Sequence, residues 1–295
     1  MSILNYGSLN IDHVYQVHHL VREGETIEST SYHTFNGGKG LNQSIALSLA
    51  GMNVYHAGKV GRDGQGLIEE LQHHHVDVNN VVMDNTGVSG HAVIQVDEQG
   101  RNSIILHSGA NHNTTKEEID NALTCVKEGE FVLIQNEINN IEYIIRQAHA
   151  LNRKVVFNPA PFTKSVRRLP LDLVSVIIVN EHEGKDLTQE TQPEAIVQAL
   201  YQLYHIETIV LTLGENGSML RTNNTIYRQP AITDIQVVDT TAAGDTFIGY
   251  LLYAMTHKYS PEQSLQLATI ASSYCISHIG ASCSIPSMND LDWER

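Results

Sequence analysis

The residues best suited to chemistry lie in the segment Asp239–Phe247, which reads Asp-Thr-Thr-Ala-Ala-Gly-Asp-Thr-Phe. It follows a strand-like run at 235–238 and precedes an apolar stretch that predicts a helix over about 243–256. Small residues before this helix leave its first N–H groups open to an anion, which the helix dipole also favours. Asp245 would lie in the first turn and could take a proton from an attacking hydroxyl. A simple N-cap is the other interpretation, but a cap needs no Ala-Ala-Gly sequence before it.

A second polar cluster is the glycine-rich segment Asn36–Gln43, which reads Asn-Gly-Gly-Lys-Gly-Leu-Asn-Gln. It matches neither the phosphate-binding P-loop nor the dinucleotide fingerprint. A tight turn would explain the glycines alone. However, Lys39 and Asn42 place directional donors and acceptors beside bare backbone, which suits a polyhydroxylated ligand.

A third candidate is the pair Asn10 and Asp12, which lie on one face of a predicted strand because side chains alternate. Two polar side chains on one face could bind adjacent hydroxyl groups. A solvated polar strand face explains the pair equally well.

The elements that must position these residues alternate between buried strands and helices. Continuous apolar runs predict strands at 3–7, 54–60, 131–134, 155–157, 174–179 and 208–212. Periodic segments predict helices at 64–73, 141–151, 181–187, 194–204, 243–256 and 261–277. Buried strands separated by helices indicate an α/β fold with a parallel sheet covered on both faces.

A β-hairpin appears to one side of this pattern, with alternating runs at 92–96 and 103–106 joined by the turn 97–100. The sequence contains no repeat and no Pro/Ser-rich linker. We therefore expect one α/β domain over 1–295, with the hairpin strands as an appendage.

Composition excludes several classes of protein. The net charge of −15 and only 18 Lys and Arg residues argue against a nucleic-acid partner. Apolar stretches are too short to cross a membrane, and the N-terminus resembles no signal peptide. Three cysteines without metal-ligand spacing are typical of reduced thiols, so we expect a cytoplasmic protein.

Taken together, these segments resemble the ribokinase-like (phosphofructokinase B-type) family of carbohydrate kinases. Residues 37–43 look like the family's N-terminal signature, and 239–247 like its C-terminal signature. Further segments that are similar to the family occur in the same order at 108–111, 158–161, 180–183 and 212–217.

The resemblance implies a three-layer sandwich with a central, mostly parallel sheet and a small β lid from about 11–35 and 81–107. It also implies transfer of the γ-phosphoryl group of ATP to a hydroxyl of a small sugar. Ala242 stands where the family more often has Gly, and this form is similar to members that act on D-ribose, giving ribose 5-phosphate. A nucleoside, deoxyribose or a sugar phosphate is the alternative substrate, and a non-catalytic sugar sensor is the alternative class. Sugar phosphates would need cationic side chains, which are few near Asn10 and Gly37.

The roles that the resemblance implies fall on matching positions. The sugar would be held by Asn10, Asp12, Gly38, Lys39, Asn42 and Glu137. The nucleotide would be lined by Asn180, Thr212, Gly214 and Gly217, with Glu183 organising the waters of Mg²⁺. The anion hole would consist of the N–H groups of Ala243, Gly244 and Asp245. A K⁺ ion would be held by Asp239, Thr241, Gly280 and Ser284. The lid would pair two chains as a homodimer.

Overall fold

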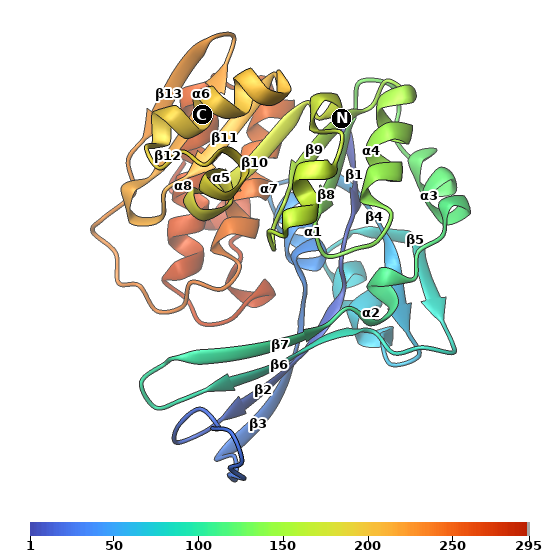
Figure 1. The fold of residues 1–295 in the computed structure, drawn as a ribbon, viewed down its shortest axis with the longest axis vertical. Helices are drawn as coiled ribbons and strands as arrows, with labels where there is room; N and C mark the ends of the chain where they lie inside the picture. Colours follow the sequence, from blue (N-terminus) through green and yellow to red (C-terminus); the bar gives the residue numbers. More distant parts are fainter. Residues whose placement is uncertain (294–295) are drawn as a thin grey trace.

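The computed structural model describes residues 1–293, which form a layered body and a projecting lid (Figure 1). Within these residues, the body contains a nine-stranded sheet with the order β13-β12-β11-β10-β9-β8-β1-β4-β5. The strands from β5 to β11 in this order run parallel, and β12 and β13 add antiparallel pairs at one edge. The bounds are β1 (Ser2–Tyr6), β4 (Asn53–Gly61), β5 (Asp77–Asp84), β8 (Phe131–Gln135), β9 (Lys154–Asn158), β10 (Val176–Asn180), β11 (Thr208–Thr212), β12 (Ser218–Thr222) and β13 (Thr225–Gln229).

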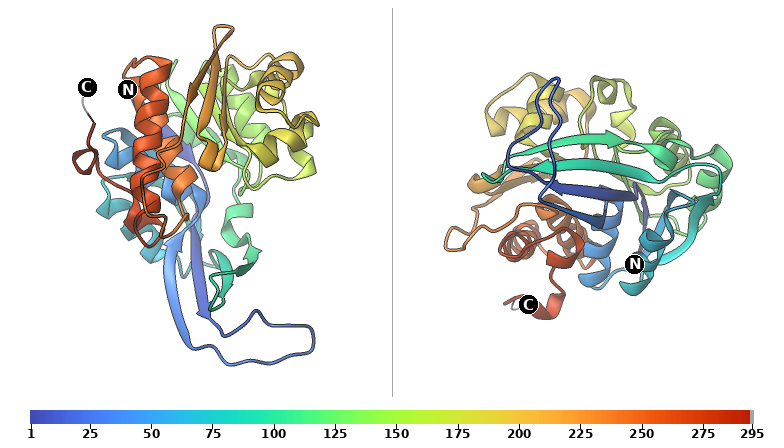
Figure 2. Two further views of the ribbon diagram at one scale, coloured as in Figure 1. Left: turned by 90° about the vertical axis from the view of Figure 1, so that its left-hand side faces the viewer. Right: turned by 90° about the horizontal axis from the view of Figure 1, so that it is seen from below.

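Helices cover both faces of this sheet (Figure 2). One face packs against α1 (Lys39–Leu49), α2 (Gln65–His73), α7 (Ala243–Thr256) and α8 (Pro261–Ile276). The other face packs against α3 (Lys116–Leu123), α4 (Ile141–Ala150), α5 (Glu181–Thr188) and α6 (Pro193–Tyr204). Alternation along β1 supplies both cores, because Ile3 belongs to the first and Leu4 to the second. The expected three-layer α/β sandwich is therefore confirmed.

The lid is a four-stranded sheet with the order β3-β2-β6-β7, which extends away from the body (Figures 1 and 2). Its strands are β2 (Asn10–Gln16), β3 (Ser31–Gly37), β6 (Gly90–Val96) and β7 (Asn102–His107). Two antiparallel hairpins meet through the parallel pair β2–β6. Residues 81–84, expected to belong to the lid, instead complete β5 of the large sheet, where they pair with β4.

The strand expected at 235–238 is absent from the described structure, and this prediction was wrong. The segment passes beyond the edge strand β13 as a loop, and Val237 and Val238 are 58% and 45% exposed. The Val238 N–H donates to the Ile276 carbonyl at the end of α8 instead of to a strand. β-branched residues favour extended backbone, but here the backbone is bonded to the end of α8 and forms no strand pair. The helix predicted after it spans 243–256 as expected.

None of the helices within residues 1–293 combines the length and the apolar character needed to cross a bilayer.

Candidate active site

A pocket of about 220 Å³ opens where β9, β10 and β11 end and where α1 and α7 begin. In parallel sheets, ligands bind at the carboxyl ends of strands, because loops and helix N-termini converge there. The pocket brings together seven residues that the sequence singled out, namely Lys39, Asn180, Glu183, Thr212, Ala243, Gly244 and Asp245. Asn158 and Ala160, which belong to the family-like segment 158–161, also line the pocket.

Asp245 lies in the first turn of α7, and its carboxylate is buried against α1. Its Oδ1 accepts a hydrogen bond from Gln43 Nε2 at 2.8 Å, and its Oδ2 accepts one from Asn42 Nδ2 at 3.1 Å. Burial raises the pKa of Asp245, although the charge of Lys39 and the two amide donors oppose this effect. Asp245 is not the N-cap of α7, because that position is Ala242, in the left-handed conformation with φ 60°. The carboxylate is therefore free of a capping role and is available as a proton acceptor.

The start of α7 presents backbone N–H groups that suit an anion. The first N–H groups of a helix have no partner within it, and the helix dipole favours an anion there. The Ala243 N–H already makes a long bond of 3.3 Å to the Thr240 carbonyl. A side chain built at Gly244 would meet no atom of the described chain within 4 Å, so glycine keeps this side of the helix start open. Gly244 and Asp245 are consequently the stronger candidates for the anion hole.

Lys39, the first residue of α1, lies among three carboxyl groups. Burial tends to lower its pKa, but the charges of Asp245, Glu137 and Glu183 outweigh burial and raise it. Lys39 therefore stays a cation at the junction between the pocket and the sugar-binding candidates. The resemblance implies that Lys39 binds the sugar, and the structure also places Lys39 in the pocket at the start of α7.

The predicted sugar-binding residues gather at the root of the lid. Asn10 Oδ1 accepts a hydrogen bond from Asn111 Nδ2 at 2.7 Å. Glu137 Oε2 accepts from the Ser8 hydroxyl and, at 3.1 Å, from the Lys39 N–H. Asn111 and Ser8 thus position two of the candidates. Sequence reasoning gave them no role, although Asn111 belongs to the segment 108–111.

Two glycines make room for this cluster. A Cβ atom at Gly37 would come within 2.2 Å of the Asp12 carboxylate. A Cβ atom at Gly90 would come within 2.2 Å of Asn10 Oδ1. The roots of β3 and β6 therefore depend on glycine so that both polar side chains can turn toward the body.

Asp12 carries a pKa raised to about 6, first because of burial and second because of the nearby charge of Glu137. The fold therefore disfavours the ionised form of Asp12. The free energy of unfolding falls as the pH rises from the ordinary pKa of an aspartate through about 6. We expect Asp12→Asn to raise the melting temperature of the ligand-free protein at pH 8. Its effect at pH 4 should be small, because Asp12 is then protonated in the folded protein. Thermal melts at the two pH values test this, and an equal shift at both would contradict it.

The nucleotide candidates divide into two groups. Asn180 and Glu183 form a capping box at the start of α5, in which each side chain accepts a hydrogen bond from the other's backbone N–H. Burial raises the pKa of Glu183, with Asn180 and Lys39 opposing it. Gly214 and Gly217 shape the turn between β11 and β12, beyond the residues that line the pocket.

The four residues proposed for a monovalent cation lie together. Asp239 accepts hydrogen bonds from the N–H and hydroxyl of Thr241 at 2.9 and 2.6 Å, and from the Gly280 N–H at 3.0 Å. The Ser284 hydroxyl donates to the Gly280 carbonyl at 2.7 Å. Although burial opposes it, these hydrogen bonds lower the pKa of Asp239, so the carboxylate is charged. One carboxylate among backbone carbonyls is a donor set that fits a hard cation.

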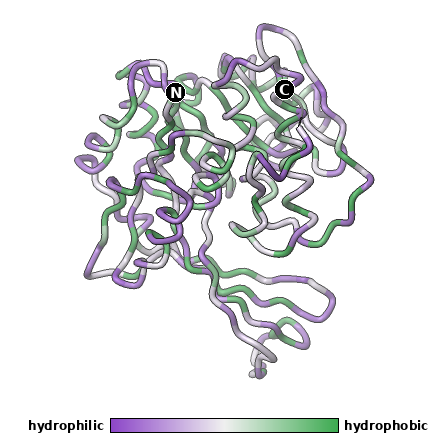
Figure 3. Tube along the Cα trace, turned by 180° about the vertical axis from the view of Figure 1, so that it is seen from behind, coloured by the Kyte–Doolittle hydropathy of each residue, from purple (hydrophilic) through white to green (hydrophobic). Residues whose placement is uncertain are grey.

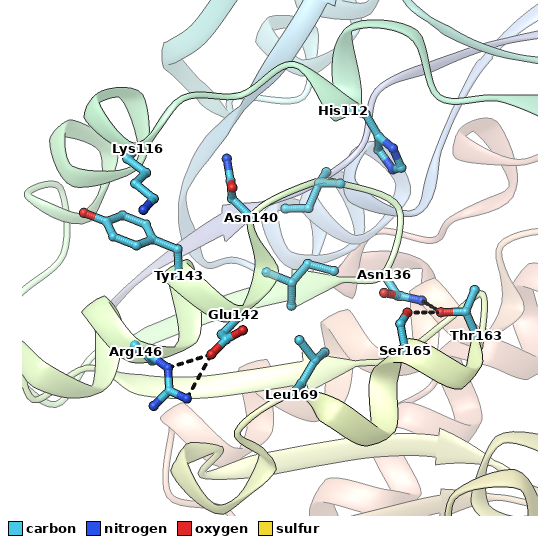
Figure 4. A pocket seen from close by; sticks show the side chains of 12 residues that line it. His112, Lys116, Asn136, Asn140, Glu142, Tyr143, Arg146, Thr163, Ser165 and Leu169 are labelled. Atoms are coloured by element: carbon cyan, nitrogen blue, oxygen red, sulfur yellow. Dashed lines mark hydrogen bonds and ion pairs between the residues drawn. The ribbon is translucent and has the colours of Figure 1, made fainter.

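A larger hollow of about 690 Å³ lies between α3, α4 and the segment after β9 (Figure 4). Its charged side chains already have partners. Arg146 pairs with Glu142 at 2.9 Å, and Lys116 lies over the Tyr143 ring. Figure 4 shows these side chains among the residues that line the hollow. Its carboxylate, Glu142, is bonded to Arg146, whereas the smaller pocket holds Asp245 and Glu183 beside Lys39 at the start of α7, so we assign chemistry to the smaller one.

Comparisons with known proteins agree with this fold. The sequence matches the pfkB family carbohydrate kinase pattern over residues 2–288, and the chain belongs to this family. It is 31% identical over 292 residues to the ribokinase of Lactococcus lactis, covering 97% of this chain and 94% of that one. The structure of Arabidopsis thaliana ribokinase complexed with ribose and ATP superposes with a TM-score of 0.87 at 30% identity, covering 97% and 96%. A Burkholderia thailandensis nucleoside kinase in complex with inosine shares the fold, with a TM-score of 0.83 at 21% identity, covering 99% and 95%.

Proposed function

We propose that this protein transfers the γ-phosphoryl group of ATP to D-ribose and releases ribose 5-phosphate. The observation that carries the proposal is the position of Asp245, which lies in the first turn of α7 and accepts a hydrogen bond from Asn42, a predicted sugar-binding residue. The relatives of about 30% identity over nearly the whole chain are ribokinases. Residues 1–295 would act as one catalytic unit in which the lid covers the sugar.

The chemistry follows from charges that the pocket holds in place. The sugar is oriented by Asn10, Asp12 and Glu137 so that its primary hydroxyl faces Asp245. Asp245 accepts the hydroxyl proton as the oxygen attacks the γ-phosphorus in line with the leaving ADP. The N–H groups of α7 and the Lys39 ammonium stabilise the charge on the transferring phosphoryl oxygens. Closure of the lid excludes water, which would otherwise compete with the sugar.

The test is an ADP-release assay with ribose, deoxyribose, inosine and fructose 6-phosphate as separate acceptors. We expect turnover to be fastest with ribose. If inosine is phosphorylated and ribose is not, the substrate is a nucleoside and the family assignment is unaffected. If no acceptor gives ADP above background while ribose still binds by calorimetry, the protein is a sugar sensor.

Magnesium fits the pocket as a hydrated ion carried by ATP. Within residues 1–293, no three His, Cys, Asp or Glu side chains converge to hold a metal directly. Mg²⁺ usually keeps several waters and binds phosphates plus one or two carboxylates. Glu183, which lines the pocket, would orient those waters. When bound, the ion neutralises charge on the β- and γ-phosphates.

A monovalent cation is expected to activate the enzyme through the cluster around Asp239 and Gly280. A cation there would sit next to the loop that leads into α7 and would hold the anion hole in shape. We expect kcat to rise several-fold when K⁺ is added to a buffer free of Na⁺ and K⁺. Equal rates with and without K⁺ would contradict this role.

We further infer that two chains pair through the lid. Phe35 and Ile104 are 49% and 56% exposed, and strand pairing places both on the lid face that carries Asp12. Figure 3 shows hydrophobic stretches along these projecting strands. We expect a dimer by light scattering and a monomer for Ile104→Glu. Ile105→Glu is the matched control, because Ile105 is 67% exposed on the opposite lid face and should leave the dimer intact. A monomeric parent protein at all concentrations would contradict the pairing.

We also propose that the enzyme is cytoplasmic. Cys125, Cys275 and Cys283 are free thiols, a state that a reducing compartment preserves.

A further inference from the structure

A chain of buried amide side chains runs beneath α1 and ends on Asp245. Gln43 of α1 donates from Nε2 to Asp245 Oδ1 at 2.8 Å and accepts, at Oε1, a hydrogen bond of 2.7 Å from Gln135 Nε2. Gln135, the last residue of β8, also donates to Asn5 Oδ1 of β1 at 2.8 Å. Asn5, Gln43 and Gln135 are 0% exposed. Three polar side chains are therefore held in the interior, where each needs its partner.

The direction of each hydrogen bond in this chain is fixed. Asn5 Nδ2 donates to the Gly40 carbonyl at 2.8 Å and to Ser44 Oγ at 2.9 Å, so its Oδ1 must face Gln135. The Gln135 amide then has to present Nε2 to Gln43 Oε1. Gln43 is left with its Nε2 facing the carboxylate, where it also reaches Asn158 Oδ1 at 3.3 Å. An amide that could rotate would offer Asp245 either a donor or an acceptor, but this one can offer only a donor.

We propose that Gln43, oriented by Gln135, is a positioning residue that fixes the Asp245 carboxylate and keeps it ionised for proton transfer. This inference rests on the proposed role of Asp245 as the general base. A fixed N–H donor on Oδ1 stabilises the anion and holds that oxygen in place. The other oxygen, Oδ2, which accepts a hydrogen bond from Asn42, is then the one turned toward the substrate hydroxyl.

The electrostatic surroundings support this role. Burial raises the pKa of Asp245, and the hydrogen bond from Gln43 opposes that rise. The other titratable groups that face it are Lys39 of α1 and Cys275 of α8. His56, which joins the far end of the chain through Ser44, has its pKa lowered to about 3 by burial, against a backbone hydrogen bond that raises it. His56 is neutral at working pH and cannot produce the acid limb of the rate profile.

Gln43→Met tests the proposal, because Met keeps the length of the side chain and removes the donor. We expect kcat to fall by about 10- to 100-fold, as for loss of a hydrogen bond to a charged group, with the sugar KM changing less than about threefold. The acid limb of the kcat profile should move up by about one pH unit, because the ionised carboxylate loses a donor. Ser48→Ala is the control, because Ser48 lies on the same helix but donates to the His74 carbonyl and takes no part in the amide hydrogen bonds. This variant should keep the parent pH profile.

Gln135→Met is a second, independent test of the proposal and replaces Gln43→Met if that variant does not fold. It should move the acid limb in the same direction by a smaller amount. In the Gln43→Met background it should have no further effect on kcat, because Gln135 acts through Gln43. An unshifted acid limb in folded Gln43→Met and Gln135→Met, together with an inactive Asp245→Asn, would overturn the inference and leave the proposed function standing. An active Asp245→Asn would instead overturn the proposed function.

Discussion

Asp245→Asn is expected to lower kcat by about 10²- to 10⁴-fold, the usual contribution of a general base. The substitution removes the proton acceptor but keeps the size of the side chain. The N–H groups at the start of α7 belong to the backbone and remain in place, so ATP should bind with an affinity close to that of the parent. Single-turnover kinetics with ribose, beside calorimetry for ATP and for ribose, separates the chemical step from binding.

The structure also explains why this variant should fold. An Asn at 245 would present its own amide N–H₂ to one of the two donors that now bind the carboxylate. Among the described residues, Asn42 Oδ1 is buried without a hydrogen-bond partner, so a rotation of the Asn42 amide can restore a donor–acceptor pair. Removing a buried charge also removes the penalty of burying it. A rate within a few-fold of the parent would show that the base lies elsewhere, and a large fall in melting temperature with lost binding would indicate a structural role.

Gly40→Ala is expected to destabilise the fold strongly. A Cβ atom at Gly40 would lie 2.4 Å from the Ser8 nitrogen and 2.5 Å from the Gly7 carbonyl carbon. These neighbours are backbone atoms at the end of β1 and cannot rotate away as a side chain would. We expect a loss of roughly 3 kcal/mol, at the upper end for overpacking. This corresponds to a fall in melting temperature on the order of 5–10 °C.

Sugar affinity should fall with it, because α1 must move away from β1 and carries Lys39 and Asn42 with it. The matched control is Gly66→Ala in the first turn of α2, where the nearest atom to the new methyl group is Asn36 Oδ1 at 3.9 Å. There alanine should be neutral or stabilising by up to about 1 kcal/mol. Equal melting temperatures for the two variants would show that the contact at Gly40 relaxes.

Local patterns in the sequence predicted the parts of the site that are local in the chain. The run of small residues before Asp245 predicted where α7 starts. The glycines at 37–40 gave the turn into α1. In both places the backbone conformation depends on consecutive residues, so a short segment of sequence is enough to predict it.

The parts that the sequence did not reveal are those assembled from distant segments. Asn5, Gln43 and Gln135 meet because β1 lies between β8 and β4, an order that no single segment encodes. One signal was present, since Gln135 ends an otherwise apolar strand whose residues are all buried. A glutamine at the end of such a strand predicts a buried polar partner but cannot say which one.

The parallel pair β2–β6 joins the two hairpins of the lid across a long stretch of sequence, since Asn10 pairs with Gly90. This pairing sets an order of events while the chain is being synthesised. The β2–β3 hairpin emerges early, and its free edge stays without a neighbour until β6 has been made. Pairing between segments so far apart forms late in folding, because it closes a long loop. The nascent chain thus carries an open strand edge with apolar side chains such as Phe35. At this stage, association with another nascent chain is a hazard.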